Sequence, residues 1–370
     1  MRAVPAMKTK IYKINDLNEN NDIIKEAGEV IRQGGLVAFP TETVYGLGGD
    51  ALNPASAKRI YSAKGRPADN PLIVHLCRIG DIETIAEEIP EIFYRLAEKF
   101  WPGPLTMILK KSQRVPFSTT GGLKTVAVRM PDHQAALVLI EAAGGFVAAP
   151  SANLSGRPSP TEANHVIKDM DGRIEMILDC GKTKLGLEST ILDLTGPLPE
   201  ILRPGSITKL MLDSVIKTGD TCPNEIAPDQ QSCTQQPCTR QPCTQQPRAP
   251  GMKYRHYAPK AQMKIITGSE CDVISYINNQ TEANRKAGLV TGVIAGKQTA
   301  KAYLADNVKC IGSRLDEEEI ARNLYRILRE FDDEITGVIY SEAFAEEGIG
   351  QAIMNRLLKA ASYQIINVSE

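Results

Sequence analysis

The sequence predicts an α/β protein with two domains. Its 370 residues exceed the roughly 100–200 residues of an ordinary domain. Extended apolar runs alternate with helical patterns between residues 21 and 205, and again after residue 263. Between these two regions, Pro, Gln, Thr and Cys replace the aliphatic residues. We therefore expect a first domain at 1–215, a linker at 216–262 and a smaller second domain at 263–370.

Composition restricts the class of protein. Hydrophobic residues make up 42% of the chain and charged residues 24%, as in ordinary globular proteins. No apolar run approaches the ~18 residues of a membrane span, and MRAVPAMKTK at the start leads into no apolar signal segment. The eight cysteines are scattered, as expected of reduced thiols, and a net charge of -1 gives no global attraction to nucleic acid. We expect a cytoplasmic protein with no membrane partner.

The first domain begins with helical signals. Asp22 can cap a helix whose Ile24, Ala27 and Ile31 share one face, and Pro54 can begin a second helix. Further helices are expected at Ile82–Phe100 and His133–Ala142. Trp101-Pro102-Gly103-Pro104 ends the first of these. Strands are expected at 35–39, 72–76, 105–109, 125–129, 146–149, 174–178, 190–194 and 200–202.

The stretch AFPTETVYGLGGDA, from Ala38 to Ala51, interrupts the pattern of a buried strand with polar residues. Pro40 ends the preceding apolar run, and hydroxyls and a carboxylate follow it directly. In open α/β sheets ligands bind outside the carboxyl ends of strands, and glycines allow a close approach of the backbone. A polar, glycine-rich connection explains the same residues. The stretch therefore predicts either a binding site or a loop.

Four further polar clusters lie near predicted strand ends. Each has an ordinary structural explanation: a solvated helix end, a histidine satisfied within the core, or a turn or cap. The same Lys and Arg donors also bind phosphate. The clusters are Lys64-Gly65-Arg66-Pro67, His75 within PLIVHLC, Ser151-Ala152-Asn153, and Glu188-Ser189-Thr190 with Arg203-Pro204-Gly205.

Together the clusters provide cations, hydroxyls and amides but no nucleophile with a histidine partner. The chain has no G-x-S-x-G elbow and only four histidines, so Ser-His-Asp hydrolysis is unsupported. It also has no H-E-x-x-H motif for metal-assisted hydrolysis. Positioning and charge stabilisation at a nucleotide phosphate fit this inventory best.

The linker contains a repeat and an unusual basic segment. Cys233 to Pro247 reads CTQQP, CTRQP, CTQQP, which is too polar and proline-rich to bury a core, so we expect disorder there. The five-residue spacing of its cysteines does not favour zinc. The following PGMKYRHYAP, Pro250 to Pro259, combines two tyrosines, a histidine and cations. A passive tether would not need these residues.

The second domain is expected to be a small Rossmann-like unit. Strands are expected at 263–266, 288–290, 308–311 and 337–340, and helices at 272–279, 316–331 and 350–361. The G-x-G-x-x-G fingerprint is missing. GVIAGKQ, Gly292 to Gln298, only approximates a P-loop, and we interpret it as a connection after a strand.

Seven motifs in order resemble one known family: PTETVYGLG, AKGRP with DNPLIVH, TVAVRMP, APSANLSG, ESTILD, LRPG and PGMKYRHYAP. They are similar to those of the threonylcarbamoyladenylate synthases, the YrdC-like family in its long two-domain form. The resemblance spans nearly the whole chain. It implies a YrdC-like twisted mixed sheet with flanking helices, followed by the smaller Rossmann-like domain. The CTQQP repeat has no counterpart in the family pattern and looks like an insertion.

The resemblance also implies a reaction. L-threonine, bicarbonate or CO2, and ATP would give L-threonylcarbamoyladenylate and pyrophosphate, through nucleotidyl transfer. The product would pass to the tRNA threonylcarbamoyl transferase machinery for threonylcarbamoyladenosine modification, and tRNA itself is a candidate partner through a weak contact. Mg²⁺ would accompany ATP, and no tightly bound protein metal site is expected.

The family's site residues map onto matching positions here. Those expected to bind L-threonine are Thr43, His75, Arg129, Ala149 and Ser189. Those expected to bind ATP are Lys64, Arg66, Asn70, Thr125, Ser151, Asn153, Ser159 and Arg203, together with Tyr254 or Tyr257 of the linker. Lys64 and Arg66 are the expected catalytic cations.

Two other functions compete with this one. A YrdC-like protein could bind RNA on a basic surface without adenylate synthesis, although the near-neutral net charge argues against it. A carbamoyl-transfer module of the hydrogenase-maturation type would usually bring zinc-binding C-x-x-C pairs, and this chain has none.

Overall fold

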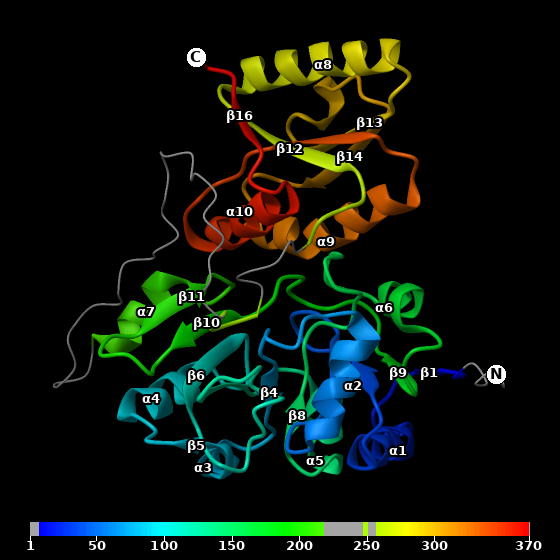
Figure 1. Cartoon of the computed structure of the whole chain (residues 1–370). Helices are drawn as coiled ribbons and strands as arrows, with labels where there is room; N and C mark the ends of the chain where they lie inside the picture. The colour runs from blue at the N-terminus through cyan, green and yellow to red at the C-terminus, as the bar shows by residue number, and fades with distance from the viewer. Residues whose placement is uncertain (1–6, 218–246, 251–256, 370) are drawn as a thin grey trace. The chain divides into compact units, whose positions relative to one another are not determined.

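The computed structural model describes residues 7–217, 247–250 and 257–369. These residues form two compact units (Figure 1). Unit 1 is Met1–Ser155, Glu162–Thr183 and Glu188–Lys253, and unit 2 is Gly156–Thr161, Lys184–Leu187 and Tyr254–Glu370. The CTQQP repeat, Tyr254 and most of PGMKYRHYAP lie outside the described residues, so the predicted boundaries of the linker stay predictions.

Unit 1 is built on one mixed sheet, in the order β1-β9-β2-β3-β8-β4-β7-β6-β10-β11, with β5 paired to β6. The sheet contains both parallel pairs, such as β4 with β7, and antiparallel pairs, such as β4 with β8. The strands are β1 (Lys10–Lys13), β2 (Val37–Phe39), β3 (Gly46–Asp50), β4 (Ile73–His75), β5 (Ala86–Glu87), β6 (Leu105–Lys111), β7 (Thr125–Arg129), β8 (Val147–Ala148), β9 (Met176–Asp179), β10 (Thr190–Asp193) and β11 (Glu200–Arg203).

One face of this sheet is covered by two helices over part of its width. Helices α1 (Asn21–Arg32) and α5 (Gln134–Ala142) pack on residues of β2, β8 and β9, such as Phe39 and Val147. The two helices approach so closely at Gly28 that a Cβ on this residue would lie 2.5 Å from the Ala142 Cβ. Every larger residue at position 28 would push them apart.

The opposite face holds the larger core. Val74, Val128 and Met107 of the central strands pack there against apolar residues of four helices. These helices are α2 (Pro54–Lys64), α4 (Glu91–Phe100), α6 (Ala163–Met170) and α7 (Lys209–Ile216). Helix α2 begins where the Asn53 side chain accepts from the Ala55 N–H, and it ends at Gly65 with φ +61°. A glycine favours this left-handed cap because it has no Cβ.

Two expectations for unit 1 are corrected. The helix predicted at Ile82–Phe100 is instead α3 (Ile82–Ile85), strand β5 and helix α4. Pro90 lacks the N–H that a continuous helix would need, and β5 pairs with β6 instead. The glycine-rich part of PTETVYGLGGD forms strand β3 and not a loop. Its glycines accommodate the Phe39 ring, because a Cβ on Gly48 would lie 2.9 Å from that ring.

Unit 2 has the expected Rossmann-like architecture: a five-stranded parallel sheet in the order β14-β13-β15-β12-β16, with helices α8, α9 and α10. The predicted strand at 288–290 is wrong: β13 comprises Thr291–Gly296, so GVIAG is itself the strand. The other elements are β12 (Gln262–Thr267), α8 (Glu270–Lys286), β14 (Asn307–Gly312), α9 (Glu317–Asp333), β15 (Val338–Glu342), α10 (Gly348–Ala360) and β16 (Ile365–Asn367).

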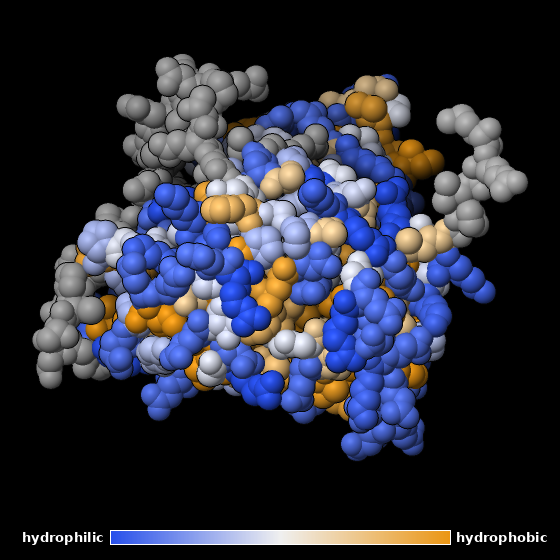
Figure 2. Space-filling model, turned by 60° about the horizontal axis from the view of Figure 1, so that its bottom comes forward, coloured by the Kyte–Doolittle hydropathy of each residue, from blue (hydrophilic) through white to orange (hydrophobic). Residues whose placement is uncertain are grey.

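The face of the molecule seen in Figure 2 is mainly polar. Figure 2 shows hydrophilic residues over most of the face in view, with hydrophobic residues in small, separate areas. Within the described ranges, no helix has both the length and the apolar character that crossing a bilayer requires.

Candidate active site

The residues predicted to bind L-threonine meet on the face of the unit 1 sheet that also carries α1 and α5. Strand alternation brings His75 to the same face as Ile73, and Arg129 to the same face as Ala127. The register pairs His75 with Arg129 directly. Among the described residues, the small apolar cluster on this part of the face contains strand and loop residues but no helix residue. Polar side chains can therefore gather beside it.

Arg129 is the centre of this group. Its Nη1 donates to Thr43 Oγ1 at 3.0 Å, and its Nε donates to the Gly103 carbonyl at 3.2 Å. Its Nη2 lies 2.6 Å from Glu42 Oε1. Thr43 itself is completely buried, and its hydroxyl also lies 2.8 Å from that of Thr41. The loop between β2 and β3 therefore brings PTET directly to the end of β7.

Glu42 is a site residue that the sequence-based set did not include. Only 3% of its side chain is exposed, and only 5% of that of Arg129. The ion pair lacks hydrogen-bond geometry, so neither Glu42 oxygen accepts a hydrogen bond from the described residues. A buried carboxylate with unused acceptors is costly unless a donor satisfies it. The sequence signal that could have identified Glu42 is its place between Thr41 and Thr43, in the polar segment that follows β2.

His75 is neutral in this environment. Burial lowers its pKa to about 3, and the positive charge of Arg129 contributes in the same direction. Its Nδ1 lies 3.2 Å from the Ile73 carbonyl, and the Phe39 ring packs edge-on at 6.2 Å. The imidazole therefore adds shape and hydrogen-bonding capacity beside Arg129 without adding a second positive charge.

Ser189 and Arg203 also meet. The Ser189 hydroxyl lies 2.7 Å from that of Thr106 on β6, and Arg203 donates to the Ser189 carbonyl at 3.0 and 3.2 Å. Arg203 Nη2 also donates to the Ser189 hydroxyl at 3.2 Å. On β6, Thr106 directly precedes Met107, which pairs with Val128 of β7. Ser189 is thus tied to the strand that neighbours Arg129.

Residues predicted to bind the nucleotide form a second group around the end of α2. Lys64 Nζ donates to the carbonyls of Ser151 and Asn153, at 2.6 Å for the latter. Lys64 is 3% exposed and thus holds the Ser-Ala-Asn turn from its interior side. Only Pro150 separates this turn from Ala149, whose N–H donates to the Ile73 carbonyl at 2.9 Å. Ala149 therefore connects the turn to the strand that carries His75.

Arg66, Asn70 and Thr125 extend this second group. Arg66 Nη2 donates to the carbonyls of Asn70 at 3.3 Å and Pro71 at 3.0 Å, which fixes the chain just before β4. Because β4 and β7 are parallel, with Ile73 opposite Ala127, Thr125 lies at the same end of the sheet as Pro71. Thr125 and Arg129 are four positions apart, or roughly 13 Å along the strand.

The remaining predicted nucleotide residues belong to unit 2. Ser159 lies in the Gly156–Thr161 segment and is 1% exposed. In the same segment, the Pro158 carbonyl accepts from Arg329 of α9 at 2.5 Å. Tyr257 stacks on Tyr325 of α9 with centroids 5.2 Å apart. Tyr254, the other linker candidate, lies outside the described residues.

The donor set favours anions over metal ions. No group of three or more His, Cys, Asp or Glu side chains with the arrangement of a metal site occurs within the described residues. Beside carboxylates such as Glu42, the buried polar residues of unit 1 include Lys64, three arginines and several hydroxyl side chains. The lysine, arginine and hydroxyl groups suit carboxylates and phosphates.

Comparison with known proteins gives the family. The family described as "Telomere recombination" (Sua5, YciO, YrdC) matches residues 29–205, and that described as "Threonylcarbamoyl-AMP synthase, C-terminal domain" matches residues 207–362. The threonylcarbamoyl-AMP synthase of Pyrococcus abyssi is 47% identical over 93% of this chain and 96% of its own length. That of Bacillus subtilis is 44% identical over 97% of this chain and its full length.

The structure agrees with the sequence comparison. The solved structure of P. abyssi Sua5 complexed with L-threonine matches with a TM-score of 0.86 and 46% identity, over 97% of this chain and all of that one. This chain belongs to the threonylcarbamoyl-AMP synthase family in its two-domain form. The family resemblance and the predicted fold class are therefore confirmed.

Proposed function

We propose that this protein is an L-threonylcarbamoyladenylate synthase, which consumes L-threonine, bicarbonate or CO2, and ATP. The observation that carries the proposal is the buried group of Arg129, Glu42 and Thr43 beside a neutral His75. It lies within a fold whose relatives of 44–47% identity are named threonylcarbamoyl-AMP synthases. Such a group offers a fixed cation and unused acceptors to a small zwitterion.

Threonine recognition follows from these charges. The guanidinium of Arg129 would attract the carboxylate of threonine through charge-assisted hydrogen bonds. The unused oxygens of Glu42 would accept from the hydroxyl or amino group of threonine, which would satisfy a buried carboxylate. Thr43, Ala149 and Ser189 would complete the shape of the site. Glu42 would therefore both contact threonine and hold Arg129 in position.

The chemistry is two bond-forming steps. The ammonium of threonine first loses a proton, and the resulting amine nitrogen joins the carbon of CO2 with release of a second proton. From bicarbonate, the same amine gives the same carbamate with release of water. A carbamate oxygen then bonds to the α-phosphorus of ATP while the α–β phosphoanhydride bond breaks and pyrophosphate leaves. Such transfers depend mainly on positioning and on neutralisation of the phosphate charges.

Lys64, Arg66 and Arg203 are the proposed neutralising cations. Lys64 is the last residue of α2, Arg66 follows the Gly65 cap, and Arg203 is the last residue of β11. Mg²⁺ enters as part of the Mg·ATP substrate, because Mg²⁺ is commonly held by substrate phosphates and water with few protein carboxylates. The Ser151–Asn153 turn, Asn70, Thr125 and Ser159 are the remaining proposed nucleotide contacts, and Tyr257 or Tyr254 the proposed linker contact.

The cellular role is part of the same proposal. The adenylate would be consumed by a cytoplasmic transferase that passes the threonylcarbamoyl group to adenosine in tRNA. This protein would meet tRNA weakly or not at all, since its net charge of -1 offers little general attraction to a polyanion.

The direct test is synthesis by the full chain. The protein is incubated with ATP, Mg²⁺ and bicarbonate and each amino acid in turn, followed by pyrophosphate measurement and mass spectrometry of the adenylate. We expect pyrophosphate release and an adenylate only with threonine. Salt-dependent tRNA binding without ATP turnover would favour the RNA-binding alternative and contradict the proposal.

A further inference from the structure

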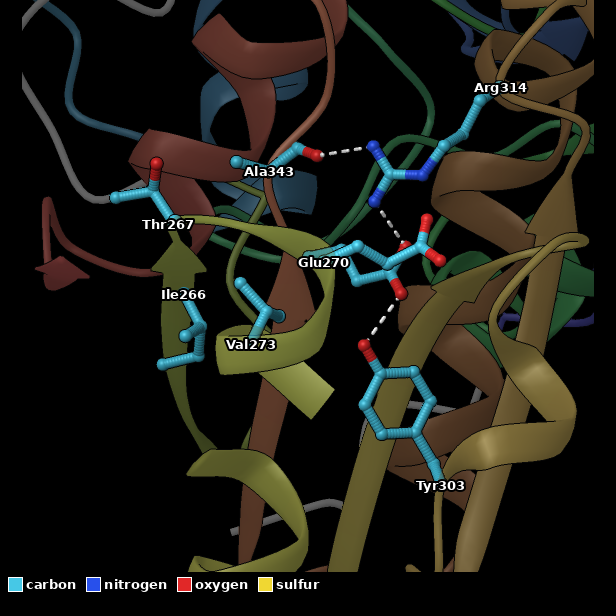
Figure 3. A pocket seen from close by; sticks show the side chains of 9 residues that line it. Ile266, Thr267, Glu270, Val273, Tyr303, Arg314 and Ala343 are labelled. Carbon is cyan, nitrogen blue, oxygen red and sulfur yellow. Dashed lines mark hydrogen bonds and ion pairs between the residues drawn. The ribbon is translucent and has the colours of Figure 1, made fainter. Parts of the chain in front are cut away.

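Unit 2 contains a cavity that the proposed synthase reaction does not use. Its volume is about 140 Å³, and it lies beside the carboxyl ends of the parallel strands β12 and β15 (Figure 3). Residues that line it include Ile266, Thr267, Glu270, Val273, Tyr303 and Arg314. In parallel α/β sheets, ligands bind at this end of the strands.

Glu342, at the end of β15, organises one wall of the cavity. Its side chain is buried, with 1% exposed, and its two oxygens accept from four donors. Oε1 accepts from Thr299 and from Tyr303 at 2.6 Å. Oε2 accepts from the Gly296 N–H at 2.8 Å and from Arg314 Nη2 at 2.7 Å. This carboxylate is satisfied, so it positions its donors and does not itself await a ligand.

Two hydrogen bonds hold Arg314 in place and leave some of its N–H donors available. One Nη donates to Glu342 and the other to the Ala343 carbonyl at 3.2 Å, as the dashed lines in Figure 3 show. A guanidinium has five N–H donors, so these two bonds leave further donors available. The side chain is 35% exposed, unlike its carboxylate partner. Arg314 is therefore a fixed cation on the cavity wall.

Glu270 supplies the opposite charge. It lines the cavity at the first residue of α8, and its carboxylate makes no hydrogen bond or ion pair with any described residue. Ser269 caps this helix by accepting from the Asp272 N–H. The other N–H groups of the first turn lack intrahelical acceptors and attract negative charge. The cavity thus has a free carboxylate close to anion-attracting groups.

We propose that this cavity binds a small zwitterionic α-amino acid. The carboxylate of the ligand would meet Arg314 and the first turn of α8, and its ammonium would meet Glu270. The side chain would rest on Ile266 and Val273. The inference goes beyond the proposed reaction and does not depend on it.

Charge and size argue against other ligands. A simple anion would be repelled by Glu270, and a simple cation by Arg314 and the positive end of α8. A nucleotide is too large, because the volume of about 140 Å³ is below the roughly 300–1,000 Å³ of pockets for drug-sized ligands. It is still several times the roughly 30 Å³ that one water occupies in the liquid. An amino acid matches both the charge pattern and the volume.

Calorimetric titration of the full chain tests the proposal. The probes are the standard L-amino acids, with acetate and methylammonium as the two half-ligands. The key variant is Glu270→Gln, which removes charge at an exposed position without a partner. Its control is Glu282→Gln, an exposed glutamate near the other end of α8 that pairs with Lys286.

We expect at least one amino acid whose affinity falls about tenfold or more in Glu270→Gln and is unchanged in Glu282→Gln. Acetate and methylammonium should bind at least about tenfold more weakly. Hydrogen exchange of the wild-type protein locates the site independently: the amino acid should protect amides at 266–273 in unit 2. Protection confined to unit 1, equal affinity in Glu270→Gln, or acetate binding as tightly as the amino acid would each overturn the proposal.

Discussion

Both units contain a buried glutamate paired with an arginine, but the two pairs differ in what surrounds the carboxylate. In unit 2, four donors satisfy Glu342 while its partner Arg314 remains 35% exposed. In unit 1, Glu42 and Arg129 are 3% and 5% exposed, and neither Glu42 oxygen accepts a hydrogen bond from a described residue. The hydrogen-bonding capacity of the Glu342 carboxylate is satisfied, and that of the Glu42 carboxylate is not.

The difference separates two ways of presenting an arginine. A satisfied carboxylate fixes its arginine and leaves it to act at a surface cavity, as Arg314 does. An unsatisfied carboxylate remains part of the recognition surface, because a ligand that donates to it removes a desolvation cost. The second arrangement sacrifices stability at the site where selectivity is needed.

The largest expected effect comes from Glu42→Gln, which leaves the Arg129 charge buried without a counter-ion. We expect the free energy of unfolding of unit 1 to fall by about 3–5 kcal/mol. The KM for threonine should also rise. Trp101 is the chain's single tryptophan and lies in the unit 1 core, so its fluorescence reports this unit.

The control is Glu29→Gln, which breaks the surface pair with Arg32, whose side chains are 46% and 53% exposed. Exposed pairs contribute up to about 1 kcal/mol, so this variant should unfold nearly as the wild type does. Equal destabilisation by Glu42→Gln and Glu29→Gln would mean that burial of the Arg129 pair has no energetic consequence.

Lys64→Ala extends the comparison to a buried cation that donates to backbone carbonyls. Loss of its charge and of its hold on the Ser151–Asn153 turn should lower threonine-dependent kcat/KM by about 10²–10³-fold. Lys58→Ala, an exposed lysine of the same helix, is the matched control and should retain activity. Wild-type rates of pyrophosphate release in Lys64→Ala would remove the proposed role of Lys64.

Glu342→Gln tests the satisfied carboxylate. An amide nitrogen in place of one oxygen would face donors, so buried hydrogen bonds would be lost at about 1–3 kcal/mol each. We expect faster amide hydrogen exchange in β13, where the Gly296 N–H loses its acceptor. Trp101 fluorescence should report an unchanged unit 1. Unaltered exchange in β13 would show that the four donors do not stabilise this sheet.

His75 gives the smallest effect and a defined pH window. Its folded pKa of about 3 lies below its ordinary value of 6.5, so the unfolded state binds the proton more tightly. The stability contribution is present above about pH 6.5 and falls as pH decreases toward 3. Between pH 6.5 and 5 the loss is about 1.6 kcal/mol, because the histidine of the unfolded state is already half protonated at pH 6.5.

The matched variant for this measurement is His75→Asn, which removes the titrating group. Urea unfolding followed by Trp101 fluorescence should show a smaller loss of stability between pH 6.5 and 5 in the variant than in the wild type. An identical pH dependence in the two proteins would mean that His75 does not titrate as its burial requires.

Local pattern predicted most of the fold. Strand β7 comprises Thr125–Arg129, as expected from its run of β-branched residues, and α9 and α10 begin and end within two residues of the expected positions. Periodicity did not reveal β5, because two residues are too few to show alternation. It also missed β3, whose glycines are dictated by the neighbouring Phe39 ring and not by turn formation.

The sequence alone determined the two-part α/β organisation, the family resemblance and most of the residues proposed for the site. These depend on local hydrophobic period and on motifs contiguous along the chain. Tertiary structure decided which of the residues meet. Thr43 and Arg129 are 86 positions apart and touch through one hydrogen bond, and Glu42 joins them only because the β2–β3 loop folds back onto β7. The wall of the unit 2 cavity likewise depends on tertiary structure, since Glu342, Gly296 and Arg314 belong to separate segments that only the parallel sheet brings together.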